Sequence, residues 1–371
     1  MSKILFLITE DWFFRSHFMP LASRARADGH DVVIAARLSG ALKDEPGLRV
    51  IDTPFARGSL APWRVGRQVS ALRELLAREQ PDIVHAIALR PIALLLMCGA
   101  ARFGRVLAVT GRGYLSVARA PWTRAVDWWL RQMIRRALGA PRTVLAVENS
   151  ADARWVEGAA PIAGARVVTM PGAGVDIVRF AAAPEAPTPP VVVGIVTRLI
   201  WSKGVDLAVE AVRRLRADGL DITLRIAGAA DPENPEHVSD AEIARWRAMP
   251  GVEVIGKVTD VAAFWAGAHI ACLPSRGGEG LPRSLLEAAA CGRPIVASDV
   301  PGCADLVTPD TGLVVAREDI DALAAALRTL AADASLRARL GVNARARVAN
   351  GYTEVHAGER AAEAWRLAGA L

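Results

Sequence analysis

Short apolar runs alternate with helix-like amphipathic stretches along the whole chain. Runs such as Ile4–Thr9 and Val191–Thr197 have the length and the β-branched content of buried parallel strands. Strands that alternate with helices predict two parallel sheets wrapped by helices, which is an α/β fold. The strand candidates are Ile4–Thr9, Asp31–Ala36, Arg49–Thr53, Ile83–Ile87, Val106–Thr110, Val144–Glu148 and Val167–Met170, and then Val191–Thr197, Ile222–Ala227, Val252–Ile255, Ile270–Leu273, Ile295–Ser298 and Leu313–Val315.

A proline-rich segment separates the two groups of strands. Residues 181–190 read AAAPEAPTPP, with four prolines in ten positions. Such a composition predicts a stiff, extended linker. We therefore place a domain boundary between residues 185 and 186. The chain after about Ala322 reads as helices.

The stretch from Gly278 to Asp305 carries the most specific pattern, GEGLPRSLLEAAACGRPIVASDVPGCAD. Pro282 suits the start of a helix, because proline is tolerated in the first helical turn. The pattern predicts a loop, a helix that stops at Cys291-Gly292, and a strand up to Ser298. Glu279 would then lie just before the helix and Glu287 on its second turn, where carboxylates and free N–H groups suit a hydroxyl-rich anion.

Glu279 and Glu287 with seven residues between them, followed by ACGRPIVASDVPG, resemble the signature of the retaining family 4 glycosyltransferases of GT-B fold. The resemblance implies two Rossmann-like domains facing each other across a cleft. Residues 1–185 would bind the acceptor and residues 186–353 the nucleotide-sugar, most simply a UDP-sugar. Residues 354–371 would pack back on the first domain. The resemblance covers nearly the whole chain and is sharpest over residues 191–305.

The start of the second half adds two cations. Arg198 follows a predicted strand, and Lys203 precedes a helix that begins at Val205. Ligands of open α/β sheets bind at this edge, and Arg and Lys both suit phosphate. The resemblance implies that both residues hold the donor diphosphate. They would stabilise the charge that collects on the leaving phosphate when the anomeric C–O bond breaks.

The resemblance assigns further donor contacts. Glu279 would contact hydroxyl groups of the donor sugar, and Glu287 would accept hydrogen bonds from the ribose. Backbone close to the ligand would come from Gly278, Gly280 and Leu281, because glycines permit close approach. The base pocket would come from the segment after Gly256, which contains Val258.

Acceptor and catalytic candidates lie in the first half. His85 is expected at the carboxyl end of a strand, where the family has a histidine that reaches the donor sugar. Residues 10–18 read EDWFFRSHF and replace the family's glycine-rich loop with aromatic residues. Arg15 and His17 are candidate phosphate or acceptor contacts there. The stretch TGRGY places Arg112 and Tyr114 in another loop, similar to an element of family members that extend polyprenyl-diphosphate sugars. A lipid-linked sugar is therefore the expected acceptor.

Pro121–Leu138 has apolar residues at helical spacing together with four arginines. One interpretation is a core helix with an exposed arginine face. The other is an interfacial helix that holds the protein on the anionic cytoplasmic face of a membrane.

Composition and charge set the remaining limits. The 371 residues suffice for two cores. Residues 1–185 contain 25 Lys/Arg and 16 Asp/Glu, whereas residues 186–371 contain 20 and 23, so an anionic partner of the first half is expected. No nucleic-acid motif is present. The four cysteines lack metal or disulfide spacing, the N-terminus reads as a strand instead of a signal peptide, and no run is long enough to span a bilayer. A peripheral, cytoplasmic protein is expected.

Two other functions stay open: a nucleotide-sugar 2-epimerase of the same fold, and a non-catalytic sugar-nucleotide-binding protein. A dehydrogenase is disfavoured, because no G-x-G-x-x-G follows the first strand. Neither Asp-x-Asp at a strand end nor ligand-spaced histidines point to a metal. We therefore expect no metal and no other cofactor.

Overall fold

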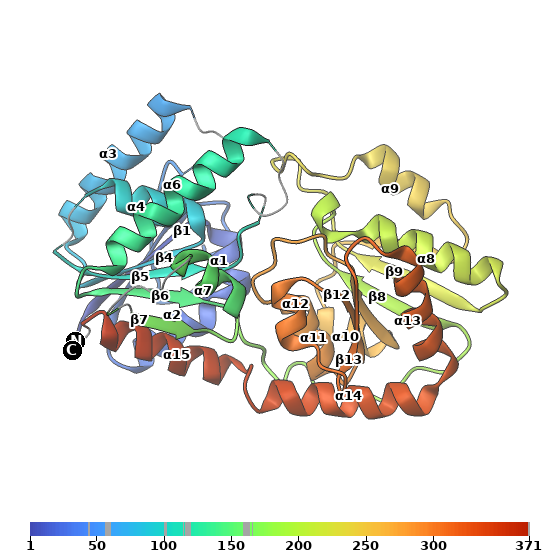
Figure 1. The fold of residues 1–371 in the computed structure, drawn as a ribbon. Coiled ribbons are helices and arrows are strands. Elements are labelled where there is room, and N and C mark those ends of the chain that lie inside the picture. The colour runs from blue at the N-terminus through green and yellow to red at the C-terminus, as the bar shows by residue number, and fades with distance from the viewer. Residues whose placement is uncertain are drawn as a thin grey trace. The chain divides into compact units, whose positions relative to one another are not determined.

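The computed structural model describes residues 1–43, 45–55, 61–99, 102–113, 115, 120–158, 164 and 166–369. The chain forms two compact units. The first comprises Met1–Ala173 and Glu354–Leu371, and the second comprises Gly174–Thr353. Each unit contains one parallel sheet with helices on both faces (Figure 1).

The first unit is built on a seven-stranded sheet in the order β3-β2-β1-β4-β5-β6-β7. Alternate residues of β1 pack into two different apolar clusters, Ile4, Phe6 and Ile8 into one and Leu5 and Leu7 into the other. Two-sided burial explains why β1 reads as a continuous apolar run. The strands are β1 (Lys3–Glu10), β2 (Asp31–Arg37), β3 (Arg49–Asp52), β4 (Ile83–Ile87), β5 (Gly104–Val109), β6 (Thr143–Val147) and β7 (Arg166–Thr169).

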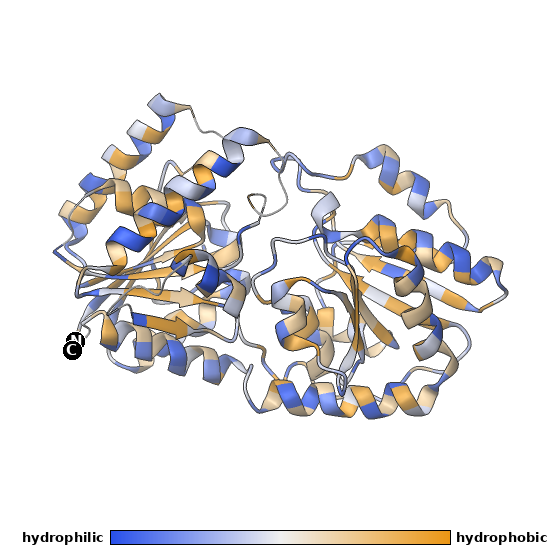
Figure 2. Cartoon of the chain, viewed as in Figure 1, coloured by the Kyte–Doolittle hydropathy of each residue, from blue (hydrophilic) through white to orange (hydrophobic). Residues whose placement is uncertain are grey.

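The helices of this unit divide between the two faces of its sheet. One face packs against α1 (Asp11–His17), α2 (Met19–Ala27) and α15 (Glu354–Leu367). The other face packs against α3 (Pro62–Glu79), α4 (Leu89–Met97), α6 (Pro121–Leu138) and α7 (Ser150–Glu157). Figure 2 shows the pattern behind this division, with orange strands and helices that are orange on one side and blue on the other.

The second unit is built on a six-stranded sheet in the order β10-β9-β8-β11-β12-β13. Its strands are β8 (Val191–Val196), β9 (Ile222–Ala227), β10 (Val252–Gly256), β11 (Ile270–Leu273), β12 (Ile295–Ser298) and β13 (Gly312–Val315). Its helices are η1 (Trp201–Lys203), α8 (Val205–Ala217), α9 (Asp240–Arg247), α10 (Val261–Ala266), α11 (Arg283–Ala290), α12 (Pro301–Leu306), α13 (Ile320–Ala332) and α14 (Ala334–Ala349).

All thirteen strand predictions are confirmed, and so are the helix at Pro282 and its stop at Cys291. The expected loop at residues 10–18 is wrong, because α1 begins directly after β1. Asp11 in the first turn and Arg15 and His17 in the last turn complement the helix dipole. Phe14 is a buried core residue and is not available to an acceptor.

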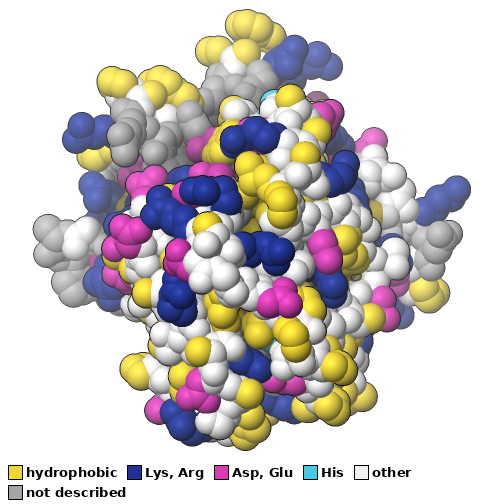
Figure 3. Space-filling model, turned by 90° about the vertical axis from the view of Figure 1, so that its right-hand side faces the viewer, with side chains coloured by type: hydrophobic (Ala, Val, Ile, Leu, Met, Phe, Trp, Pro, Cys, Tyr) yellow, Lys and Arg dark blue, Asp and Glu magenta, His cyan; other side chains and the backbone are white. Residues whose placement is uncertain are grey.

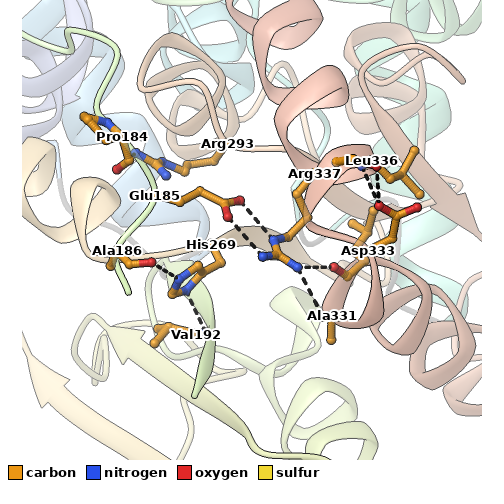
Figure 4. Close-up of polar contacts among 12 residues, drawn as sticks. Pro184, Glu185, Ala186, Val192, His269, Arg293, Ala331, Asp333, Leu336 and Arg337 are labelled. Atoms are coloured by element: carbon orange, nitrogen blue, oxygen red, sulfur yellow. Dashed lines mark hydrogen bonds and ion pairs between the residues drawn. The ribbon is translucent and has the colours of Figure 1, made fainter. Parts of the chain in front are cut away.

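The second unit begins before the proline-rich linker, so the boundary expected at residue 185 lies too late. Residues 174–186 pack on this unit through arginines that are distant in sequence. Arg337 forms an ion pair with Glu185 at 2.9 Å, and Arg293 donates to the Pro184 carbonyl at 3.2 Å (Figure 4). His269 accepts from the Val192 amide at 2.9 Å and contacts the Ala186 carbonyl at 3.0 Å. The linker is therefore attached along its first part.

The face of the second unit in Figure 3 shows basic and acidic side chains interspersed, with apolar groups between them. This mixture agrees with the small charge difference of residues 186–371. Within the described part of the chain, no helix is both long enough and apolar enough to cross a membrane.

Candidate functional site: the β8 and β11 connections

The second sheet changes winding direction between β8 and β11. The chain goes from β8 to its neighbour β9 on one side, and β11 lies on the other side of β8. Loops that leave the carboxyl ends of such a strand pair separate and open a crevice, which is where open α/β sheets bind ligands. The connection after β8 contains Arg198 and Lys203, and the connection after β11 contains Gly278 and Glu279.

Lys203 and Glu279 meet at this edge. The Lys203 Nζ lies 2.8 Å from Oε1 and 2.7 Å from Oε2 of Glu279. Ser275 donates its hydroxyl to Oε1 of the same carboxylate. Glu279 is 8% exposed, and burying a carboxylate demands such partners. The structure thus brings together two of the residues predicted from sequence and adds Ser275.

Two glycines permit the close packing of these connections. A Cβ on Gly204 would lie 2.0 Å from the Pro274 carbonyl oxygen, and Gly204 has a positive φ of 66°. A Cβ on Gly302 would lie 1.6 Å from the Gly280 carbonyl oxygen. Any other residue at these positions would push the loops apart. The approach of Gly204 to Pro274 holds the connection that carries Lys203 against the end of β11, and the approach of Gly302 to Gly280 holds α12 against the loop that carries Glu279.

Arg198 forms a separate contact. Its Nη1 lies 2.9 Å from Oδ2 of Asp231, which follows β9, and its side chain is about half exposed. The guanidinium is therefore at the same edge of the sheet as Lys203, paired with a carboxylate that sequence reasoning did not single out. The guanidinium of a partly exposed arginine has the donor geometry that suits phosphate.

Glu287 lies on the second turn of α11, as predicted. Arg283 donates to its carboxylate at 2.8 Å, one helical turn earlier. Burial raises the pKa of Glu287, and the charges of Arg283 and Arg179 oppose that rise. The carboxylate oxygens of Glu287 are acceptors, which suits ligand groups that donate hydrogen bonds, such as sugar hydroxyl groups.

The remaining donor-binding candidates are Gly278, Gly280, Leu281 and Val258. Gly278 has a φ of 80°, in the region that favours glycine. The Leu281 side chain packs in the apolar cluster around α11, and Val258 packs against the same cluster. Contact with a ligand at Gly280 and Leu281 would therefore use backbone groups.

The expectation for His85 is wrong. The strand β4 continues to Ile87, and His85 lies in its middle, paired in register with Phe6. Its ring packs 5.3 Å from the Phe6 ring, and Trp365 of α15 donates its indole N–H to Nδ1 at 3.2 Å. Alternation along β4 directs residue 85 into the same cluster as Ile83 and Ile87. His85 is a core residue and does not reach the edge of the sheet.

This burial predicts a pH-dependent stability. Desolvation lowers the pKa of His85 to about 3 from an ordinary value of 6.5. Between these values the unfolded chain binds a proton that the folded chain does not, so the free energy of unfolding falls as the pH falls below 6.5. The expected slope is about 1.4 kcal/mol per pH unit from this residue. Denaturant unfolding at pH 7 and pH 4.5 should show a smaller loss in His85→Phe; an equal loss would contradict the assignment.

The first-unit acceptor candidates lie on two elements. Arg15 on α1 pairs with Glu45 at 3.2 Å and is largely exposed. His17 on the same helix packs against Phe13 with the rings tilted and their centroids 4.5 Å apart. Arg112, in the loop after β5, lies 3.6 Å from Asp152 and over the Trp155 ring. Tyr114 lies outside the described residues.

The helix α6 has a tryptophan-rich outer face. Its buried side chains are Thr123, Leu130, Ile134 and Leu138. Its tryptophans stay exposed, with Trp122 at 49%, Trp128 at 57% and Trp129 at 40%. The arginines Arg124 and Arg136 are exposed on the same helix. The apolar residues of α6 thus form both a face that packs in the core and a face that is exposed at the surface.

The described ranges contain no group of three His, Cys, Asp or Glu side chains that could hold a metal ion. Sequence reasoning missed Ser275 and Asp231, and also Arg276 with its partner Asp206. Ser275 carried a usable signal, because it follows β11 directly in the same connection as Glu279.

Comparison with known proteins places both units in glycosyltransferase families. Residues 190–333 match the model of "Glycosyl transferases group 1", and residues 16–179 match that of "Glycosyltransferase Family 4". A capsular polysaccharide biosynthesis glycosyltransferase, CapM of Staphylococcus aureus, is 28% identical over 44% of this chain and 42% of its own length. A GDP-mannose-dependent monoacylated phosphatidylinositol monomannoside mannosyltransferase of Corynebacterium glutamicum is 33% identical over 50% and 53%.

The chain thus matches about half the length of each of these curated relatives. Among solved structures, HepE of Anabaena in complex with UDP-glucose superimposes with a TM-score of 0.74 at 19% identity, over 99% of this chain and 100% of that one. At that identity the likeness concerns the fold. The two matched models and the two parallel sheets agree with each other, and the chain therefore belongs to the family 4 (group 1) glycosyltransferases and has the GT-B fold.

Proposed function

We propose that this protein transfers a sugar from a UDP-sugar to a lipid-linked saccharide and retains the anomeric configuration. The observation that carries the proposal is the Lys203–Glu279 pair at the switch point of the second sheet, buttressed by Ser275. A cation and a carboxylate at this edge suit a ligand with a diphosphate and a hydroxyl-rich sugar.

The chemistry assigned to these residues is electrostatic. The bond between the anomeric carbon and the donor phosphate breaks, and negative charge collects on the leaving diphosphate. Lys203 and Arg198 offset that charge without a metal ion. An acceptor hydroxyl forms the new bond on the same face of the sugar and gives its proton to the departing phosphate. Glu279 orients the sugar, and Glu287 accepts hydrogen bonds from the ribose.

Support for the donor comes from two directions. The HepE structure is described as a complex with UDP-glucose, whereas the name of the Corynebacterium relative specifies GDP-mannose. Both are sugar nucleoside diphosphates and would present the same diphosphate to Lys203. The uracil base is proposed on the fold likeness over the full chain.

A nucleotide screen tests this donor site. We expect UDP to raise the melting temperature of the metal-free protein, because a ligand of the folded state stabilises it by mass action, by about 2.7 kcal/mol at a hundred times Kd. We expect NAD to have no effect. Glu287→Ala should raise at least tenfold the UDP concentration that is needed for the same shift in melting temperature. Glu253→Ala, which removes an exposed glutamate on β10, should leave that concentration unchanged. Equal responses of both variants would contradict the ribose assignment.

A membrane location is proposed for the lipid-linked acceptor. Residues 101–150 contain nine arginines, with Asp127 and Glu148 as the only acids. On α6, the tryptophans Trp122, Trp128 and Trp129 are exposed, and so are Arg124 and Arg136 of the same helix. Indole rings and arginines together suit the headgroup region of an anionic cytoplasmic leaflet.

Vesicle sedimentation tests this location. The protein should bind vesicles that contain phosphatidylglycerol and not vesicles of phosphatidylcholine alone. Replacing all three tryptophans of α6 by alanine should lower the partition coefficient by about tenfold or more, which corresponds to about 1.4 kcal/mol. The control is Val342→Ala, an exposed apolar residue of the second unit. Unchanged partition of the triple variant would exclude α6 as the membrane-binding element.

A further inference from the structure

One arginine beside the candidate donor site links three connections of the second sheet. Arg276 follows β11 and donates to both carboxylate oxygens of Asp206 on α8, at 2.8 and 2.7 Å. It donates to the Trp201 carbonyl at 2.6 Å. Its Nε lies 3.1 Å from Glu318, which follows β13. Its own backbone N–H donates to the Ser202 carbonyl at 2.8 Å.

These contacts flank the donor residues on both connections. Trp201 and Ser202 directly precede Lys203, and Arg276 lies between Ser275 and Glu279. The guanidinium therefore holds the connection that carries Lys203 against the connection that carries Glu279. The contacts of Arg276 described above go to Trp201, Ser202, Asp206 and Glu318. Its effect on the pair would be geometric.

The arrangement is stronger than an ordinary surface ion pair. The Arg276 fork is bidentate and both side chains are largely shielded, at 23% and 26% exposure, which favours specific geometry over a mobile contact. Glu318 adopts a φ of 61°, a conformation that costs free energy for a residue with a Cβ. The cluster therefore maintains a defined arrangement of the β8, β11 and β13 connections.

We propose that Arg276 is a positioning residue, which sets the distance between Lys203 and Glu279 that the leaving diphosphate requires. This proposal rests on the proposed function. It assigns to Arg276 a role in turnover that is exerted through Lys203 and not by contact with the donor.

A double-mutant cycle on kcat tests the proposal. Arg276→Ala should lower kcat by about 10- to 100-fold, and Lys203→Ala should lower it by about 100- to 1,000-fold. If Arg276 acts through Lys203, the double variant should lie within about threefold of Lys203→Ala alone. Effects that multiply would overturn the proposal. Arg276→Lys, which keeps the charge and loses the fork, should recover only part of kcat.

The control is Arg225→Ala, which removes a comparable ion pair of the second unit, to Glu253 at 2.6 Å, and should leave kcat unchanged. A loss of kcat in that variant as large as in Arg276→Ala would overturn the positioning role. If Arg276→Ala fails to fold by circular dichroism, the cycle is run with Arg276→Lys and the same criterion. The two failures are distinguishable: an inactive wild-type protein overturns the proposed function, whereas an active one with multiplying effects overturns only the role of Arg276.

Discussion

Lys203→Ala should lower the kcat of sugar transfer by about 100- to 1,000-fold, because removal of one charge that offsets the developing charge of a transition state has an effect of that size. Lys203 contacts both carboxylate oxygens of Glu279, at 2.8 and 2.7 Å, and so lies at the centre of the candidate donor site. The measurement is steady-state release of UDP with a saturating donor. The exposed Lys43→Ala in the first unit should retain kcat.

Loss of folding is the competing explanation and has its own control. Lys203→Ala removes two charge-assisted hydrogen bonds from the buried Glu279 carboxylate, which destabilises the unit. The double variant Lys203→Met with Glu279→Gln removes both charges and should recover thermal stability. We expect it not to recover activity. Recovery of kcat along with stability would mean that Lys203 is structural.

Trp365→Ala should destabilise the first unit by about 3 to 5 kcal/mol, the range for removing a buried tryptophan from a core. The Trp365 side chain is 1% exposed. It contacts Phe6 edge-on with ring centroids 6.1 Å apart and donates its indole N–H to His85 at 3.2 Å. The loss would therefore combine a cavity beneath α15 with an unsatisfied imidazole nitrogen. Thermal unfolding monitored by near-ultraviolet circular dichroism measures it.

The matched control is Trp63→Ala on α3, where the side chain is 71% exposed and the expected change is within about 0.5 kcal/mol. Trp365→Phe keeps an aromatic ring but loses the N–H donor together with the pyrrole part of the indole. We expect a loss between those of Trp63→Ala and Trp365→Ala, to which the unsatisfied nitrogen contributes about 1 to 3 kcal/mol. Equal melting temperatures for Trp365→Ala and Trp63→Ala would contradict the contribution of Trp365 to the core.

The central strands were predictable because they are buried on both faces. An apolar run such as Val191–Val196, bounded by Pro190 and by the polar Thr197-Arg198, has no alternative location than the interior of a sheet. The donor loops were predictable for a similar reason. Pro282 marks a helix start, and Glu279 must then lie at the carboxyl edge of a parallel sheet.

The prediction for His85 is wrong although the sequence contains the pattern that corrects it. Alternation along β4 places residue 85 on the same face as Ile83 and Ile87, and the run of alanines and Trp365 in the last helix covers that face. The resemblance to the family favoured a sheet-edge position instead. The loop predicted at residues 10–18 is wrong for a different reason. Asp11 and Arg15 have the charges that suit the first and last turns of a helix.

Other features depend on contacts between residues far apart in the sequence. The early start of the second unit follows from Arg345 bound to the Phe180 carbonyl and Arg337 bound to Glu185. The Arg276 cluster joins residues 206, 276 and 318. No local sequence pattern specifies which arginine pairs with which distant carboxylate or carbonyl group.

The proposed reaction is sugar transfer with retention from a donor bound at Lys203 and Glu279. The most direct test incubates the purified protein with isotopically labelled UDP-sugar and a polyprenyl-diphosphate-linked saccharide, and then determines by NMR the anomeric configuration of the product. We predict an acceptor-dependent product with the configuration of the donor, absent in Lys203→Ala. An inverted product, or release of a sugar altered at C2 without any acceptor, as an epimerase would give, would contradict the claim.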